Sequence, residues 1–196
     1  MSAKREITRD DILPMDQYAA ERAARRKQIS AVKKNRRAPV GPDATFYFEN
    51  YDTMWYQIHE MLHVEKGGEE QIADELEAYN PLIPNGKELV ATMMFEIDDP
   101  DRRDRVLHQL GGVENTITLT IGDDVVQAVP ENDVERTKPD GKTSSIHFLH
   151  FPLSASQVDS FKNKAVKAVL GFSHNHYAHM AVISDAVRNS LIDDLD

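Results

Sequence analysis

Apolar residues recur at helical spacing in the first half of the chain. Between residues 52 and 66, one face of a helix with 3.6 residues per turn carries Met54, Trp55, Ile58, Met61 and Leu62. A second helix is predicted up to Pro81, which ends it. Residues 98–110, 154–165 and 184–195 are also predicted to be helices, because each begins with Asp or Ser, which cap helix N-termini.

Alternation of apolar and polar residues predicts strands elsewhere. Residues 116–121 alternate isoleucine and leucine with threonine, and a Gly-Asp-Asp turn leads to a partner strand at residues 125–129. Similar patterns predict strands at residues 45–49, 88–97, 145–151, 166–172 and 177–183. Because short turns join several of these strands, the sequence predicts an α+β fold with an antiparallel or mixed β-sheet and helices mainly on one face.

The N-terminal segment has a different character. Residues 17–36 are rich in Ala, Glu, Arg and Lys, which favour a helix, but their apolar face is thin. Residues 38–42 (APVGP) are predicted to end this helix in a turn. We therefore expect one domain, in which residues 1–42 form a basic N-terminal helical arm and residues 43–196 form the α+β body.

Charge is distributed unevenly along the chain. The net charge is −10, but residues 1–37 carry 11 Lys/Arg and 5 Asp/Glu, a net charge of +6 that leaves −16 for the rest. We favour contact of the basic helix with the acidic body or with a second copy in a homo-oligomer. Nucleic-acid binding is the less favoured alternative, because the acidic body would repel a polyanion and no aromatic residues interleave the basic ones. Its candidate residues are Arg22, Arg25, Arg26, Lys33, Lys34, Arg36 and Arg37.

Composition limits the chemistry that the chain can carry. The 196 residues are 40% hydrophobic and 29% charged, which is typical of a globular protein. The absence of cysteine excludes disulfides, thiolate catalysis and metal sites that need cysteine. No apolar run is long enough to span a membrane, and the first residues lack the apolar core of a signal peptide. We therefore expect a cytoplasmic protein without a membrane segment.

The motif His59-Glu60-Met61-Leu62-His63 matches H-E-x-x-H. Two histidines four residues apart on a helix can bind one zinc ion, and the glutamate can activate a metal-bound water. However, both histidines fall on the flank or outer face of the predicted helix, and no G-x-x-H follows. A third ligand would have to be Glu75, Glu77 or Glu88, and nothing in the sequence selects among them. We therefore favour the interpretation that both histidines lie on the protein surface. The less favoured interpretation is a catalytic zinc or iron site in which Glu60 is the base.

Two other histidine pairs lie in or beside predicted strands. His174 and His176 are two residues apart, so they could share a strand face and chelate a metal, although a polar hairpin loop is the simpler interpretation. His147 and His150 are three residues apart, which places them on opposite faces of a strand. One of them is expected to face the core or a partner, and the other solvent.

The loop at residues 78–86 (AYNPLIPNG) contains two prolines and could form the rim of a pocket. A tight connection between a helix and a strand is the favoured interpretation. Its binding candidates are Tyr79, Asn80 and Pro81, and the corresponding candidates in the basic helix are Arg25, Arg26, Lys33 and Lys34.

Several segments resemble the bacterial family catalogued as domain of unknown function 3501. They are residues 7–14 (ITRDDILP), 48–50 (FEN), 52–53 (DT), 57–58 (QI), 60–62 (EML), 75–76 (EL), 78–84 (AYNPLIP) and 147–149 (HFL), with Phe151, His174 and Tyr177. The resemblance implies a cytoplasmic protein of no assigned activity. It also implies a partner among rubrerythrin-like or iron–sulfur oxidoreductases that handle redox chemistry or peroxide. The family pattern often has Gln and Arg at the positions of His59 and His63, which argues against a catalytic metal site.

Three functions follow from these patterns. The leading hypothesis is a non-catalytic accessory or binding protein that contacts a redox partner through the basic helix or the loop at residues 80–84. A metal-dependent enzyme that uses His59, Glu60 and His63, or His174 and His176, is the alternative. Nucleic-acid binding through the basic helix is the third.

Overall fold

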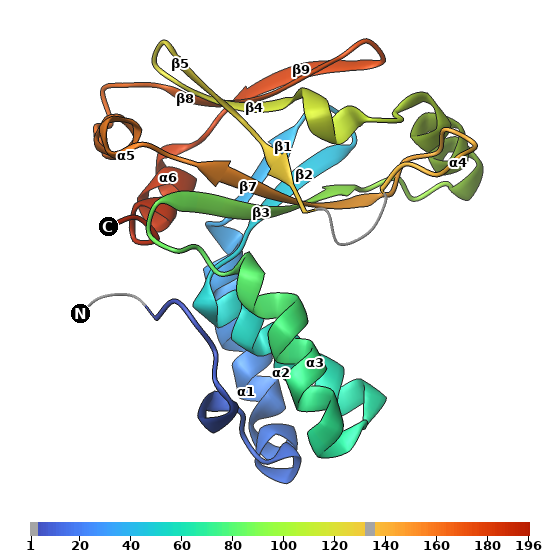
Figure 1. Cartoon of the computed structure of the whole chain (residues 1–196), viewed down its shortest axis with the longest axis vertical. Coiled ribbons are helices and arrows are strands. Elements are labelled where there is room, and N and C mark those ends of the chain that lie inside the picture. Colours follow the sequence, from blue (N-terminus) through green and yellow to red (C-terminus); the bar gives the residue numbers. More distant parts are fainter. Residues whose placement is uncertain (1–3, 132–135) are drawn as a thin grey trace.

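The structure, a computed structural model, describes residues 4–131 and 136–196. These residues form two antiparallel β-sheets that pack face to face (Figure 1). Sheet 1 has the order β1 (Arg37–Val40), β2 (Ala44–Phe48), β3 (Glu88–Phe95), β7 (Ile146–Pro152) and β6 (Val129–Pro130). Sheet 2 has the order β5 (Asp124–Gln127), β4 (Ile117–Ile121), β8 (Ala168–His174) and β9 (Tyr177–Val182). The predicted α+β fold with antiparallel pairing is confirmed, with the strands divided between two sheets.

The main core lies between the two sheets. Alternate residues of each strand point inward, and Phe46, Phe151 and Phe172 are almost completely buried there. The rings of Phe46 and Phe172, one from each sheet, lie 5.5 Å apart between centroids. Burying each such side chain contributes about 1.5–3 kcal/mol. The core also includes residues of α5 (Ala155–Lys162) and α6 (Asp185–Ile192).

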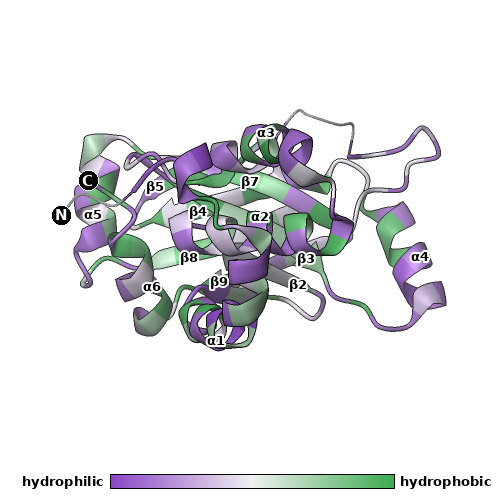
Figure 2. Ribbon diagram, turned by 90° about the horizontal axis from the view of Figure 1, so that it is seen from below, coloured by the Kyte–Doolittle hydropathy of each residue, from purple (hydrophilic) through white to green (hydrophobic). Residues whose placement is uncertain are grey.

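A layer of three helices extends away from sheet 1 (Figure 1). It contains α1 (Met15–Lys34), α2 (Tyr51–Glu65) and α3 (Gly68–Tyr79), with the short turns η1 (Arg9–Asp11) and η2 (Asn80–Leu82). Seen from below, α2 lies between α1 and α3, and the helices expose hydrophilic residues (Figure 2). A second, smaller core joins this layer to Val90 on the outer face of sheet 1. The remaining elements are α4 (Pro100–Gln109) and η3 (Val113–Thr116).

The turn predicted at residues 38–42 is only partly correct, because residues 37–40 form β1 and the chain turns at residues 41–43. This strand pairs with β2 from Arg37 opposite Tyr47 to Val40 opposite Ala44. β1 is an edge strand, where Pro39 can be accommodated although it has no N–H to donate. Residue 42 therefore lies in the turn of the hairpin that joins β1 to β2.

None of the helices in residues 4–131 and 136–196 combines the length and the apolar character that a membrane span requires.

Candidate functional site

A groove of about 450 Å³ lies in the angle between the helical layer and the outer face of sheet 1. We call it the sheet groove. Its floor consists of outward-facing residues of β2, β3 and β7, together with Glu49, which directly follows β2. The strand residues are Tyr47, Thr92, Met94, Ile146 and Phe148. Its wall is formed by Met54, Gln57, Tyr79 and Leu82, and its rim by Lys33 and Arg37. The volume lies within the range of small-molecule and side-chain binding pockets.

Strand pairing explains how the floor forms. Arg37, Tyr47, Thr92 and Phe148 are consecutive partners across β1, β2, β3 and β7, so their side chains form one row on the outer face. Met94 and Ile146 belong to the next row. The helices cover only the end of the face around Val90, which packs in the smaller core. The two rows therefore remain open beside the helical layer.

Polar groups are placed around this apolar floor. The buried carboxylate of Glu49 accepts a hydrogen bond from Thr92 Oγ1 at 2.7 Å. Gln57 Nε2 donates to the hydroxyl of Tyr79 at 3.5 Å. The guanidinium of Arg37 lies 5.2 Å from the centre of the Tyr47 ring, within the range of a cation–π contact. The groove therefore combines hydrophobic surface with a cationic rim.

A line of cations leads along α1 towards the groove. Arg26, Lys33, Lys34 and Arg37, which we call the basic stripe, form no ion pair within residues 4–131 and 136–196. Lys33 instead lies over the ring of Tyr56, at 5.9 Å from its centre. Lys33 and Arg37 therefore place positive charge at the rim of the groove, although the buried carboxylate of Glu49 also lines it.

Apart from Lys27, which also forms no ion pair within the described residues, the other basic residues of this segment have protein partners. Arg22 forms two hydrogen bonds of 2.8 Å with Glu60, and Arg25 pairs with Glu21 at 2.7 Å and lies over Trp55. Arg36 is only 2% exposed, so including it among nucleic-acid contacts is wrong. The chain before β1 folds back against β2 and α6, and this places Arg36 in the interior.

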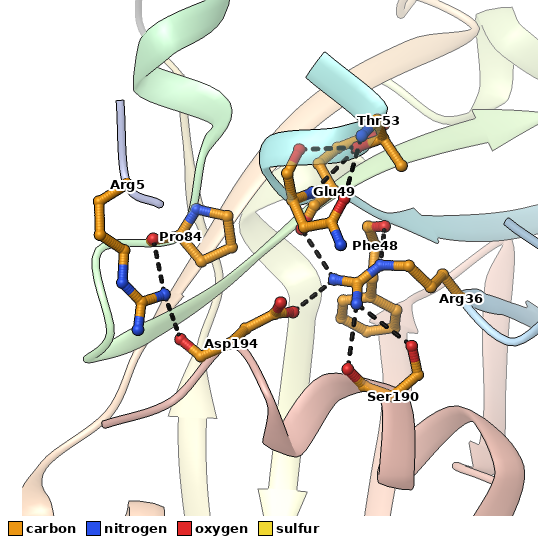
Figure 3. Close-up of polar contacts among 9 residues, drawn as sticks. Arg5, Arg36, Phe48, Glu49, Thr53, Pro84, Ser190 and Asp194 are labelled. Carbon is orange, nitrogen blue, oxygen red and sulfur yellow. Dashed lines mark hydrogen bonds and ion pairs between the residues drawn. The ribbon is translucent and has the colours of Figure 1, made fainter. Parts of the chain in front are cut away.

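Arg36 joins several elements of the fold (Figure 3). It donates to the carbonyl oxygens of Phe48 and Glu49, each at 2.9 Å, and to that of Ser190 at 3.1 Å. It also forms a buried ion pair with Asp194. Arg5 binds the main-chain oxygen of Asp194, so this polar cluster ties the N-terminal segment to the C-terminal one.

The prediction that His59 lies on the surface is wrong, because His59 is fully buried. Its Nε2 accepts a hydrogen bond from the Leu13 N–H at 3.1 Å, and its Nδ1 donates to the Trp55 carbonyl at 2.7 Å. Its ring lies 3.8 Å from that of Trp55 and 4.9 Å from that of Tyr18. Burial lowers the pKa of His59 and favours the neutral ring. Because α1 and the segment before it cover this flank of α2, both ring nitrogens have protein partners.

Glu60 is also held in place. Besides Arg22, its carboxylate accepts a hydrogen bond from the Tyr18 hydroxyl at 2.7 Å. Mainly through the hydrogen bonds from Arg22, the pKa of Glu60 is lowered to about 2. His63 lies apart from the sheet groove and lines a cleft of about 670 Å³ at the far end of the helical layer. The H-E-x-x-H residues thus connect α2 with α1.

His174 and His176 lie far from His59 and His63. They are at the turn between β8 and β9, on sheet 2, whereas His59 and His63 are in the helical layer (Figure 1). Their ring centroids are 5.9 Å apart, and the His176 N–H donates to His174 Nδ1 at 3.3 Å. In the part of the chain that the structure describes, no three His, Cys, Asp or Glu side chains are arranged to hold a metal ion. The structure therefore does not bring the two histidine pairs together.

The loop candidates have different roles. Tyr79 lines the sheet groove. Asn80 holds the N-terminal segment instead, because its side chain accepts from the Ile7 N–H at 2.8 Å and donates to the Ile7 carbonyl at 2.9 Å. Pro81 is exposed in η2. Of the binding candidates singled out from the sequence, Lys33, Arg37 and Tyr79 line the groove. The floor residues have no motif, and only their alternation within strands indicates that they share a face.

His147 and His150 point to opposite sides of β7, as the sequence predicts. His147 is fully buried in the interior, and His150 lies on the outer face between Glu88 and Glu131, at 3.0 and 2.9 Å. Hydrogen bonding to Glu88, and also to Glu131, raises the pKa of His150. A raised folded-state pKa stabilises the protein below the unfolded-state value of about 6.5, and this contribution is lost as the pH rises through the folded-state pKa.

We therefore predict that His150→Gln lowers the free energy of unfolding by about 1–2 kcal/mol at pH 5.5, and by less at pH 8.5. Urea unfolding of the variant and the wild type at both pH values measures this difference. His108→Gln is the control, because the exposed His108 pairs only with exposed carboxylates and should change stability by less than about 0.5 kcal/mol at either pH. If His150→Gln lowered the free energy of unfolding by the same amount at both pH values, the assignment of a charged His150 would be contradicted.

Comparisons with known proteins extend this description. A family model described as a protein of unknown function (DUF3501) matches residues 6–195. Among solved structures, the chain is similar to a novel protein of unknown function from Burkholderia pseudomallei K96243, whose crystal structure was determined at 1.90 Å resolution. The two are 37% identical with a TM-score of 0.89, over 97% of this chain and 99% of the other. No curated protein matches the chain.

Proposed function

The chain belongs to the DUF3501 family of proteins of unknown function, and we propose that it is a non-catalytic binding protein for a protein partner. In this proposal, the sheet groove and the basic stripe together hold an acidic segment of the partner that also carries an apolar side chain. The observation that carries it is that Lys33 and Arg37, which form no ion pair in the described part of the chain, stand at the rim of a largely apolar floor.

The dimensions favour a protein segment as the ligand. The basic stripe runs along α1 from Arg26 to Lys34, a distance of eight residue steps, or about 12 Å at 1.5 Å per residue. An extended peptide covers that length with about four residues. Carboxylates along such a segment can meet the cations of the stripe, and an apolar side chain can enter the groove against Met94, Ile146 and Phe148.

The positions of the candidate catalytic groups support a non-catalytic role. Both nitrogens of His59 are engaged, with the N–H of Leu13 before α1 and with the carbonyl of Trp55 within α2, and both oxygens of Glu60 accept hydrogen bonds from α1. The proposal also includes a cytoplasmic location. A rubrerythrin-like or iron–sulfur oxidoreductase, the partner class that the family resemblance implies, is the first full-length partner to test.

A labelled peptide of defined sequence tests the proposal directly. We expect fluorescein-labelled Glu-Asp-Phe-Glu-Leu-Asp to bind the wild type with a Kd on the order of 50 µM in fluorescence anisotropy. Lys33→Glu combined with Arg37→Glu should weaken binding at least tenfold, because two attractive charges become repulsive. The matched control combines Lys164→Glu with Lys167→Glu, which makes the same change in net charge at exposed positions away from the groove.

Measurements at about 0.15 M salt limit long-range effects of net charge, since the Debye length is then about 8 Å. The control pair should weaken binding by less than about threefold. The proposed site would be contradicted if the two double variants lost affinity for the acidic peptide to the same extent. It would also be contradicted if the wild type bound the charge-reversed peptide Lys-Lys-Phe-Lys-Leu-Lys as tightly as the acidic one.

A further inference from the structure

Glu49 is a buried carboxylate that lines the sheet groove and uses only one of its two oxygens. It is 7% exposed, and its N–H donates to the Val90 carbonyl at 2.8 Å, where the smaller core begins. Its Oε1 accepts the hydrogen bond from Thr92 Oγ1. Within residues 4–131 and 136–196, no group donates to Oε2, and Glu49 forms no ion pair. Oε2 is therefore an acceptor whose partner comes from solvent or from a ligand in the groove.

The cations at the rim do not neutralise this carboxylate. Lys33 lies over the ring of Tyr56, at 5.9 Å from its centre, and Arg37 lies over the ring of Tyr47, at 5.2 Å. Arg37 is exposed and Lys33 half-buried, whereas Glu49 is buried. A ligand that enters the groove therefore meets positive charge at the rim and a negatively charged acceptor further in.

We propose that the groove selects a tryptophan side chain and that Glu49 is the residue that determines this specificity. The inference rests on the proposed function and names the side chain that the acidic segment of the partner inserts. The indole ring packs on Met94, Ile146 and Phe148, and its N–H donates to Oε2 of Glu49. A phenylalanine or leucine side chain also fits an apolar floor, but it removes water from Oε2 without supplying a donor, which is unfavourable for a charged acceptor.

The same contacts disfavour other donors. A lysine or arginine of the ligand would pass the like charges of Lys33 and Arg37, and it would lose hydration on the apolar floor. A tyrosine hydroxyl donates as well, but its oxygen is also an acceptor that needs a partner when it is buried. The indole N–H only donates, so one hydrogen bond to Oε2 satisfies the whole polar part of the side chain.

A pair of peptides that differ in a single N–H tests this inference. The first is fluorescein-labelled Glu-Asp-Trp-Glu-Leu-Asp, and in the second the tryptophan is replaced by 3-benzothienylalanine, which has the same shape but carries sulfur in place of the indole N–H. We expect the wild type to bind the tryptophan peptide about tenfold more tightly in fluorescence anisotropy, because only this peptide donates to a charged acceptor.

Glu49→Gln should reduce this preference to below about threefold, because a neutral amide is a weaker acceptor than a carboxylate. The substitution keeps the size of the side chain and an oxygen for Thr92 Oγ1, and its urea midpoint checks that the fold is kept. Glu96→Gln is the matched control. It removes the same charge from an exposed residue directly after β3 that accepts a hydrogen bond from the Tyr47 hydroxyl, and it should keep the tenfold preference.

Equal affinities of the wild type for the two peptides would overturn the inference, as would an unchanged preference in Glu49→Gln. Tighter binding of Glu-Asp-Arg-Glu-Leu-Asp than of the tryptophan peptide would also overturn it, because the groove would then select a cation. If the two peptides bound equally but both lost affinity in the Lys33→Glu, Arg37→Glu variant, the site for an acidic segment would stand and only the choice of side chain would fail. If none of the peptides bound saturably, the proposed function itself would be contradicted.

Discussion

Replacing Arg36 with alanine is expected to lower the free energy of unfolding by about 3–5 kcal/mol. The substitution leaves the carboxylate of Asp194 buried without its partner, and burial already raises the pKa of this group. It also removes donors from the carbonyl oxygens of Phe48, Glu49 and Ser190 (Figure 3). Because these groups belong to β2, the start of α2, and α6, the loss affects contacts between elements far apart in the sequence.

Urea unfolding monitored by circular dichroism measures this effect. Arg37→Ala is the matched control, because Arg37 is the next residue and carries the same charge, but it is exposed and its guanidinium lies over the Tyr47 ring. It should change stability by less than about 1 kcal/mol. Similar losses for the two variants would mean that the buried cluster does not connect these elements as described.

Replacing Arg188 with methionine is expected to lower the free energy of unfolding by about 3 kcal/mol. Arg188 is buried in α6, and no carboxylate in the described part of the chain forms an ion pair with it. It donates to the carbonyl oxygens of Phe161 at 2.8 Å, Ser160 at 3.1 Å and Asn163 at 3.0 Å, and also to that of Val166. These oxygens lie at and after the C-terminal end of α5, where helical carbonyls lack partners and favour a cation.

Methionine keeps much of the apolar stem that packs near Phe161, so the loss reports mainly on the hydrogen bonds. Thermal and urea unfolding should both show the decrease. Asn189→Ala, at the exposed adjacent position of α6, should change stability by less than about 0.5 kcal/mol. If Arg188→Met also changed the free energy of unfolding by less than about 0.5 kcal/mol, the role of Arg188 as a cap of α5 would be contradicted.

Much of the fold can be predicted from local patterns. The apolar face of α2 and the alternation in β4 are visible in the sequence because each element buries one side. The strand β1 cannot be recognised in this way, because Pro39 and the glycine after Val40 are typical of a turn. Only pairing with β2 makes it a strand. Local patterns also cannot show that the strands divide between two sheets.

The candidate site is less predictable, because it depends on which face the helices cover. Alternation shows that Thr92 and Met94 share a face, but not that this face is the outer one or that it stays open. Lys33 and Tyr79 could be singled out because they lie next to a basic run and a proline-containing loop. The burial of His59 arises from α1 and the preceding segment, which cover a flank of α2 that the helical pattern marks as solvent-facing.

Mapping the bound peptide on the protein tests the central claim most directly. In a titration of ¹⁵N-labelled protein with the Glu-Asp-Phe-Glu-Leu-Asp peptide, we expect the largest amide shifts at Lys33, Arg37, Tyr47, Met94 and Ile146. The Lys33→Glu, Arg37→Glu variant should lose these shifts. Shifts centred on the cleft beside His63 or on sheet 2, or no saturable shifts at all, would contradict binding in the sheet groove.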